Sequence, residues 1–284
     1  MAGRVLFVES RCKLSFSNNY LLVDGVDGVG KYYLDDIEAV VFSSLAVSMS
    51  AYLLNELATK GKTVVFCDDR RFPCSGLIPL YGVQSAYAKI KEQMHWQECA
   101  KASVWRSIVI GKIHCQQEVL SANGLEYSFE ETVQENDAGN AEGRFADHYF
   151  HRLFGRNFRR HLTDDLNIAL NYGYTILCSA MARIAAGHGY IPSLGIHHCG
   201  ETNNINLACD CVEPFRPAVD EVVFKCGKKK LDKEYKAELI LVLNREIYYR
   251  GSCCSVRYAM ERYFCDVVSS MRNNEVDLGE IRLH

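Results

Sequence analysis

Two adjacent histidines and two carboxylates lie close together in one short segment of this 284-residue chain. His197 and His198 precede a loop rich in Gly and Asn, and Asp210 and Glu213 follow that loop. Carboxylate oxygens suit hard divalent cations, and a histidine nitrogen beside them favours Mn²⁺ while still permitting Mg²⁺. The segment therefore holds the donors of an open metal site. It fits equally a loop histidine, a helix-capping Asp210 and a surface Glu213.

The same segment also carries soft ligands. Cys199, Cys209 and Cys211, together with His197 or His198, are the donor types that Zn²⁺ prefers. Structural zinc sites usually take pairs of cysteines two to four residues apart, whereas a single residue separates Cys209 from Cys211 and Cys199 stands alone. The spacing favours buried, unpaired cysteines that act as small apolar side chains, and it leaves a zinc site as the alternative.

A third candidate is Glu142, which lies near the start of a helical pattern that begins at Asn140. A carboxylate in the first turn of a helix is stabilised by the positive end of the helix dipole. Glu142 can therefore be a metal ligand or only a favourable helix-start charge, and its position alone allows both.

Basic residues are concentrated just downstream of Glu142. The arginines are Arg152, Arg156, Arg159 and Arg160. If the helix continues past Gly155, the first three of them are spaced i, i+4 and i+7 and form one stripe that can bind DNA phosphates. The alternative is an ordinary solvated helix face.

The elements that must position these residues change in type along the chain. Period-two alternation and turn residues predict strands over 4–8, 13–17, 20–23, 37–42 and 63–67, with a helix over 50–60. Pro and Gly residues between 73 and 82 suit an interdomain connection.

The remainder of the chain carries helical periodicity. The pattern covers 85–123, with an interruption at Gly111, and 140–154, 166–186 and 235–271. Residues 125–139 contain five acids and no Lys or Arg, which predicts a solvated or mobile loop. The expected architecture is therefore an α+β fold, in which a small β-rich N-terminal domain (1–80) precedes a larger, all-α-helical C-terminal domain (81–284).

Composition narrows the class of protein. With 48% hydrophobic and 24% charged residues the chain is globular, and with 32 Lys and Arg against 35 Asp and Glu it has no global positive field, so a nucleic-acid site must be a local patch. The chain has 13 cysteines, and its first residues lack the cationic stretch and apolar run of a secretory signal. We therefore expect reduced thiols and a cytoplasmic protein. The apolar runs are shorter than the ~20 residues that span a bilayer, so no membrane contact is expected.

Ordered motifs along nearly the whole chain resemble those of one known family. They are DDIEAVVF (35–42), LLNELATKGKTVVFCDD (53–69), KIHCQ (112–116), D-x-x-N-x-E-G (137–143), YFHRLFG (149–155), LNYGYTIL (170–177), LGIHH (194–198) and EPFRPAVD (213–220). The family is that of the CRISPR spacer-acquisition integrases, and the resemblance is to its type II branch.

The resemblance implies a site. The family holds Mg²⁺ or Mn²⁺ with a Glu, a His and a second carboxylate, which correspond to Glu142, His198 and Glu213 here. Asp210 corresponds to an acid that supports the site. His198 is preferred to His197 because it follows Glu142 by 56 residues and precedes Glu213 by 15, as in the type II branch.

The resemblance also implies an activity and partners. The expected reaction is attack by the 3′-hydroxyl of a captured DNA fragment on a phosphodiester at a CRISPR repeat boundary, and water in place of the hydroxyl gives endonuclease activity. No nucleotide cofactor is expected, since the sequence lacks a phosphate-binding G-x-x-x-x-G-K-[ST] loop. The expected assembly is two homodimers that flank a dimer of a small ferredoxin-like protein, with the N-terminal domain carrying dimerisation and partner contacts.

Two other functions remain open at this stage. A branched-DNA endonuclease in repair would use the same metal site without a dedicated partner. A zinc-stabilised DNA-binding or scaffolding module would instead use the histidines and cysteines of the 197–211 segment.

Overall fold

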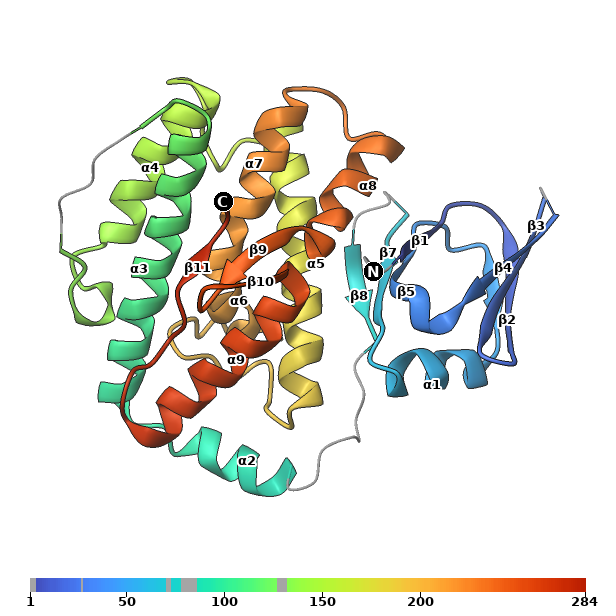
Figure 1. Cartoon of the computed structure of the whole chain (residues 1–284), viewed down its shortest axis with the longest axis horizontal. Coiled ribbons are helices and arrows are strands. Elements are labelled where there is room, and N and C mark those ends of the chain that lie inside the picture. Colours follow the sequence, from blue (N-terminus) through green and yellow to red (C-terminus); the bar gives the residue numbers. More distant parts are fainter. Residues whose placement is uncertain (1–3, 27, 70–72, 78–85, 127–131) are drawn as a thin grey trace. The chain divides into compact units, whose positions relative to one another are not determined.

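The computed structural model describes residues 4–26, 28–69, 73–77, 86–126 and 132–284. The chain divides into two compact units (Figure 1), Met1–Gln84 with Ala186–His188, and Ser85–Ala185 with Gly189–His284. Strands dominate the first unit and helices the second, which makes this a mixed fold.

The first unit contains a mostly parallel sheet of four strands. Its order is β1-β5-β7-β8, with β1 (Arg4–Val8), β5 (Ile37–Phe42) and β7 (Thr63–Cys67) parallel and β8 (Pro73–Gly76) antiparallel to β7. Pro73 opens the edge strand, where a missing N–H costs no interior ladder bond. The predicted interdomain connection is thus partly wrong, because its first residues complete a sheet; its Pro79 and Gly82 lie outside the described residues.

A second sheet of the first unit has the order β4-β3-β2-β6. Strands β2 (Cys12–Ser17), β3 (Tyr20–Gly25) and β4 (Gly28–Tyr33) form an antiparallel meander, and β6 (Val47–Met49) pairs with β2 in parallel. The β2–β3 turn is Asn18-Asn19, both at positive φ, as a two-residue hairpin of this kind requires. The sequence prediction missed β4, β6 and β8.

Helix α1 (Ala51–Thr59) follows β6 and begins at Ser50, whose side chain accepts a hydrogen bond from the backbone N–H of Leu53 at 3.2 Å. Such a cap satisfies one of the unpaired donors at a helix start. Side chains from both sheets and α1 share one apolar core, which includes Val8, Leu14, Leu21, Ile37, Val40, Leu53, Leu57 and Val64.

The second unit is built around a 25-residue helix, α3 (Glu98–Ala122). The other helices are α2 (Ala86–Met94), α4 (Ala141–Phe154), α5 (Asp165–Gly187), α6 (Asn206–Val212), α7 (Arg216–Cys226), α8 (Lys233–Leu241) and α9 (Val256–Asn273). Helix α3 packs against α4, α7 and α9, and α3 and α4 lie side by side in Figure 1. None of the described helices combines the length and hydropathy needed to cross a bilayer.

The predicted pattern over 85–123 forms two helices, because the chain leaves helical geometry between α2 and α3, at His95–Gln97. Gly111 does not interrupt the pattern and lies inside α3. A single Gly costs a helix interior about 1 kcal/mol, which the packing of α3 outweighs.

The all-helical prediction for the C-terminal domain is wrong. Between α8 and α9, strands β9 (Glu246–Tyr249) and β10 (Ser252–Ser255) form a hairpin, and β11 (Ile281–Arg282) pairs with the other side of β9. The turn is Arg250-Gly251, with φ of 49° and 75°. Side chains of β9 alternate between exposed and buried, which is the period of two of a strand. This strand lies inside the stretch 235–271, for which helical periodicity had predicted a helix.

Candidate metal centre

Glu142 lies in the first turn of α4, and residues of the predicted acidic loop fix that turn. The Asp137 carboxylate accepts hydrogen bonds from the backbone N–H of Ala141 at 2.8 Å and of Glu142 at 3.1 Å. Asp137 thereby satisfies two donors at the start of α4. Residues 132–139 are therefore held against the folded unit, and most of them are exposed, as expected of a solvated loop.

Lys112 of α3 joins two of the predicted ligands. Its Nζ donates hydrogen bonds to Glu142 Oε1 at 2.5 Å and to Glu213 Oε2 at 2.6 Å. The lysine side chain is 9% exposed, Glu213 is 2% exposed and Glu142 is 28% exposed. Two carboxylates from distant segments therefore face one cationic group in a largely buried position.

The opposite charges around Lys112 and Glu213 keep both side chains ionised. Burial works to lower the pKa of Lys112, but Glu213 and Glu142 raise it more, so the amine stays protonated. Burial works to raise the pKa of Glu213, but Arg216, whose Nη1 lies 3.0 Å from Glu213 Oε1, and Lys112 together lower it below its ordinary value. The carboxylate of Glu213 is therefore ionised despite its burial.

Asp210, in α6, organises the loop that carries the histidines. Its Oδ2 accepts from the backbone N–H of Ile196 at 2.6 Å and of His197 at 3.1 Å, and its Oδ1 accepts from the N–H of His198 at 3.0 Å. A Cβ on Gly195 would lie 2.2 Å from the carbonyl oxygen of His198, so the tight loop requires glycine there. Asp210 is completely buried by this arrangement.

The same carboxylate orients the imidazole of His198. His198 Nδ1 lies 2.6 Å from Asp210 Oδ1, and because a carboxylate can only accept, Nδ1 carries the proton. This hydrogen bond raises the pKa of His198. Nε2 is left to bind a metal, and a carboxylate behind a ligating histidine is the usual second partner in metal sites.

The two histidines have different surroundings. The His197 ring stacks on the Trp105 indole with centroids 4.2 Å apart and an interplanar angle of 2°, and its Nδ1 lies 3.1 Å from Asn136 Oδ1. His198 presents its ring edge-on to Trp105 at 5.6 Å. The geometry thus favours His198 over His197 as the ligand.

The donor set suits a hard divalent cation. Glu142 and Glu213 supply carboxylate oxygens, His198 supplies Nε2, and the charge of Glu213 is close enough to raise the pKa of His198. In this conformation the donor atoms of Glu142, His198 and Glu213 do not all lie within 4.8 Å of one another. Among the described residues, only His114, Cys115 and Glu118 form a group that does. Lys112 Nζ occupies the space between the two carboxylates.

The simpler interpretation of the segment is wrong in two respects. Glu213 is a buried residue and not a surface one, because it opens the short 3-10 helix Glu213–Phe215 beneath α3. Asp210 lies inside α6 and binds the preceding loop, whereas a helix-capping residue would precede its helix.

The cysteines of the segment do not assemble a zinc site. Cys199 is exposed, Cys211 is buried, and no described cluster of metal donors includes them or Cys209. Residues i and i+2 of a helix point in different directions, which separates Cys209 from Cys211 on α6. Contact with the thiol of Cys178 lowers the pKa of Cys209 to about 6.

The arginine stripe does not form as a helix face. Helix α4 ends at Phe154, where Gly155 takes φ of 95°, so Arg156 and Arg159 lie beyond the helix. Arg159 Nη1 donates to the carbonyl of Arg156 at 2.8 Å. Arg152 is exposed on α4 and Arg156 is exposed after it.

Arg160 is held by the protein itself. Its guanidinium donates to Asn167 and Asn171, the latter at 2.9 Å, and lies 5.4 Å from the Tyr174 ring centroid. These contacts fix the segment after α4 against α5.

Sequence reasoning gave no role to three residues of this centre: Lys112, Arg216 and Trp105. Lys112 heads the KIHCQ motif and Arg216 lies inside EPFRPAVD, so both were marked by a motif. Their roles became visible only through contacts across the fold.

Comparisons with known proteins identify what this chain is similar to. The sequence model described as "CRISPR associated protein Cas1" matches residues 5–246. A CRISPR-associated endonuclease Cas1 from Neisseria meningitidis serogroup C is 32% identical over 288 aligned residues, covering 98% of this chain and 93% of that protein.

Solved structures share the fold. One is a casposase bound to integration product, with a TM-score of 0.77, 15% identity, and coverage of 97% of this chain and 92% of that one. Another is a chain of a Cas6-RT-Cas1–Cas2 complex, with a TM-score of 0.67, 20% identity, and coverage of 97% of this chain and 36% of that one. The family match and the Neisseria relative extend over most of the sequence, and the chain therefore belongs to the Cas1 family of CRISPR-associated proteins.

Proposed function

We propose that this protein is a metal-dependent DNA integrase and endonuclease that inserts captured DNA fragments into a CRISPR array. The observation that carries the proposal is the convergence of Glu142 and Glu213 on one cationic group, beside a histidine oriented by the buried Asp210. Membership of the Cas1 family and the likeness to a casposase bound to integration product support the same reaction.

In this proposal Mg²⁺ or Mn²⁺ is held by Glu142, Glu213 and Nε2 of His198. A metal held there would supply Lewis-acid chemistry for activating a hydroxyl and for stabilising the leaving oxygen of a phosphodiester exchange. Asp210 keeps the proton on Nδ1 of His198 and thereby leaves Nε2 free for coordination. Arg216 holds Glu213 in its ionised form, in position for binding a cation.

Lys112 has a double role in this arrangement. It neutralises the two carboxylates, and it must withdraw from the space between them when a divalent cation binds both. An ammonium close to the metal site would also suit a phosphate oxygen of the DNA.

DNA contacts are assigned to the exposed Arg152 and Arg156 near the end of α4. Arg159 and Arg160 belong to the same basic segment, and their guanidinium groups also donate hydrogen bonds within the protein. A local patch of this kind suits a chain whose net charge is −3.

The proposed assembly is a homodimer, two of which flank a dimer of a small ferredoxin-like partner, with the first unit supplying dimer and partner contacts. Likeness to a chain of a Cas6-RT-Cas1–Cas2 complex supports a partner protein.

All 13 cysteines are free thiols, which fits a cytoplasmic protein.

The test is the Glu142→Gln variant in a joining assay with a DNA fragment, a repeat-containing plasmid and Mg²⁺ or Mn²⁺. Joining should be lost while the protein stays folded, because Glu142 is 28% exposed and Lys112 keeps Glu213 as its partner. Glu98→Gln is the matched control, because Glu98 is also a first-turn glutamate but is 87% exposed and remote from the cluster. Glu142→Gln that is folded and joins at the parent rate would refute the proposal.

The same assay separates integration from repair cleavage. An integrase yields fragment-to-plasmid joints, whereas a branched-DNA nuclease cuts branched substrates and leaves no joints. Cleavage of branched DNA without any joint would favour the repair function.

A further inference from the structure

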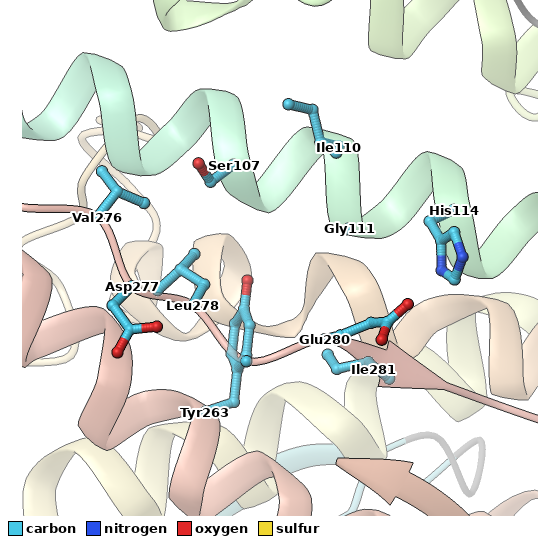
Figure 2. A pocket seen from close by; sticks show the side chains of 11 residues that line it. Ser107, Ile110, Gly111, His114, Tyr263, Val276, Asp277, Leu278, Glu280 and Ile281 are labelled. Carbon is cyan, nitrogen blue, oxygen red and sulfur yellow. The ribbon is translucent and has the colours of Figure 1, made fainter. Parts of the chain in front are cut away.

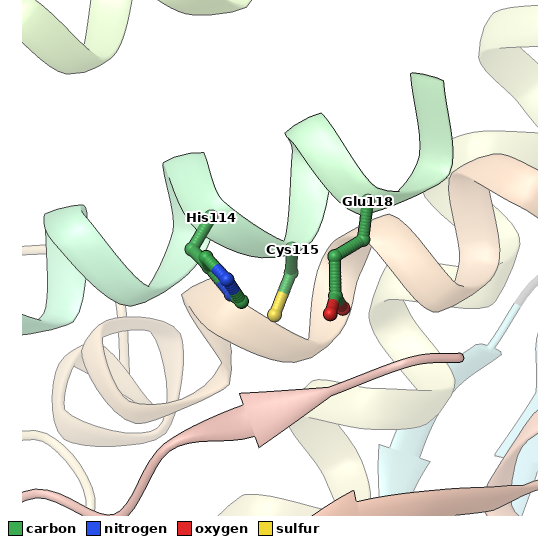
Figure 3. Close-up of side chains that lie close together, drawn as sticks. All are labelled: His114, Cys115 and Glu118. Carbon is green, nitrogen blue, oxygen red and sulfur yellow. The ribbon is translucent and has the colours of Figure 1, made fainter. Parts of the chain in front are cut away.

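Helix α3 carries a second group of metal-binding side chains, and nothing in the proposed reaction uses it. A nitrogen of His114, Sγ of Cys115 and a carboxylate oxygen of Glu118 all lie within 4.8 Å of one another. Figure 3 shows the three side chains projecting from the same side of α3. Around the axis of α3, His114 lies about 200° from Lys112, whereas Cys115 lies about 60° from it.

The neighbouring chain holds these donors in place. Leu283 N–H donates to Glu118 Oε2 at 2.7 Å, and Cys115 Sγ lies 3.7 Å from the carbonyl oxygen of Ile281, in β11. Cys115 is buried, while His114 and Glu118 are half-buried. The donors are thus fixed where α3 meets the C-terminal segment.

Negative charge lies near Cys115, since the carboxylates of Glu118 and Glu280 are close to its thiol. A thiolate and a carboxylate would together balance the two positive charges of a divalent ion.

A cavity of about 420 Å³ adjoins the group, lined by His114, Tyr263 and Glu280 among others (Figure 2). The hydroxyl of Tyr263 points into it toward α3, although the residue is only 2% exposed, and it has no hydrogen-bond partner among the described residues. A buried hydroxyl left unpaired costs about 1–3 kcal/mol. This group therefore indicates that the cavity holds water or a ligand, and it offers a partner for a molecule bound to the ion.

We propose that His114, Cys115 and Glu118 form a second metal site, for a zinc-class divalent ion, with its open coordination positions facing this cavity. The N, S, O donor set matches Zn²⁺ and Co²⁺, in contrast to the O, O, N set of the catalytic centre. On binding, Cys115 gives its proton to water and its sulfur lone pair to the ion. The bound ion would then link α3, which carries Lys112, to the C-terminal segment, because Glu118 also accepts a hydrogen bond from Leu283 N–H.

Co²⁺ is the probe, because a thiolate bound to it gives a sulfur-to-cobalt charge-transfer band that a site without sulfur cannot give. We expect one equivalent of Co²⁺ per chain to produce the band and Zn²⁺ to displace it. Cys115→Ser should abolish the band. Cys209→Ser, which removes another cysteine of the same unit, should keep it and is the control.

A second variant keeps the test decisive if Cys115→Ser does not fold. His114→Gln alters a half-buried residue, and it should weaken Co²⁺ and Zn²⁺ binding at least tenfold in equilibrium dialysis. Zn²⁺ should also raise the melting temperature of the parent protein more than that of His114→Gln. Absence of the band in the parent, its loss in Cys209→Ser, or unchanged affinity in folded His114→Gln would each overturn the proposal.

Discussion

Replacing Lys112 by Met removes the one ammonium that Glu142 and Glu213 share. Methionine has a similar length and fits the buried path of the side chain, so the substitution tests charge more than packing. Without the ammonium, Glu213 keeps Arg216 as a partner, but the two carboxylates then face each other with no positive charge between them.

The magnitude follows from burial. Breaking a buried ion pair by removal of one partner costs about 3–5 kcal/mol. Arg216 remains beside Glu213, and Glu142 is 28% exposed and partly screened, so the lower end, about 3 kcal/mol, is expected. For a unit of this size 1 kcal/mol corresponds to about 2–4 °C, so the melting temperature in chelator should fall by about 6–12 °C.

The assay is thermal unfolding followed by circular dichroism, in chelator and with increasing Mn²⁺. Mn²⁺ should stabilise Lys112→Met more than the parent, because in the parent the ion must displace the ammonium. At a free concentration of 100 times Kd, bound metal contributes about 2.7 kcal/mol and should restore most of the loss.

Lys225→Met is the matched control. Lys225 Nζ lies 2.7 Å from Glu221, but its side chain is 59% exposed, so the loss should stay below about 1 kcal/mol and be insensitive to Mn²⁺. The reasoning would be refuted by a Lys112→Met protein as stable as the parent in chelator, or by one that Mn²⁺ stabilises no more than it stabilises the parent.

Three further variants test other parts of the structure. Asp210→Asn should weaken Mn²⁺ binding about 10–100-fold, since His198 loses the carboxylate that orients it; calorimetric titration that gives an unchanged affinity would contradict this. Burial raises the pKa of Asp220 to about 6, above its ordinary value of 3.8. The stability that this carboxyl contributes is therefore present below about pH 3.8. About 3 kcal/mol of it is lost as pH rises through about 6. Asp220→Asn should therefore flatten the decline in melting temperature between about pH 4 and about pH 6, and an equal decline in both proteins would count against the assignment. Replacing Arg152 and Arg156 by Gln should reduce the slope of log affinity against log salt for duplex DNA by about 0.9 per phosphate contact, and an unaltered slope would assign both to a solvated surface.

Much of the local structure follows from the sequence, because it depends on neighbours within a few residues. Alternating apolar side chains and the Asn18-Asn19 turn specify the β2–β3 hairpin, and the periodicity over 140–154 specifies α4 to within one residue of its start. The donor types and their order along the chain were also readable, since side-chain chemistry does not depend on the fold.

Local signals failed where two patterns overlapped or a single residue overrode them. The hairpin at Arg250-Gly251 lay hidden in a stretch with apolar residues at both helical and strand spacing. Gly155 ended α4 by taking a positive φ, so the arginines beyond it could not share a helix face.

The sequence by itself therefore predicted the donor residues of the proposed catalytic centre. Only the tertiary structure decided that Lys112 lies between Glu142 and Glu213, which are 30 and 101 residues away along the chain, and that Asp210 closes the histidine loop around its own carboxylate. Such contacts depend on how α3, α4 and the segment before α7 pack together. That packing depends on the burial of many side chains at once, so a local sequence pattern does not predict it.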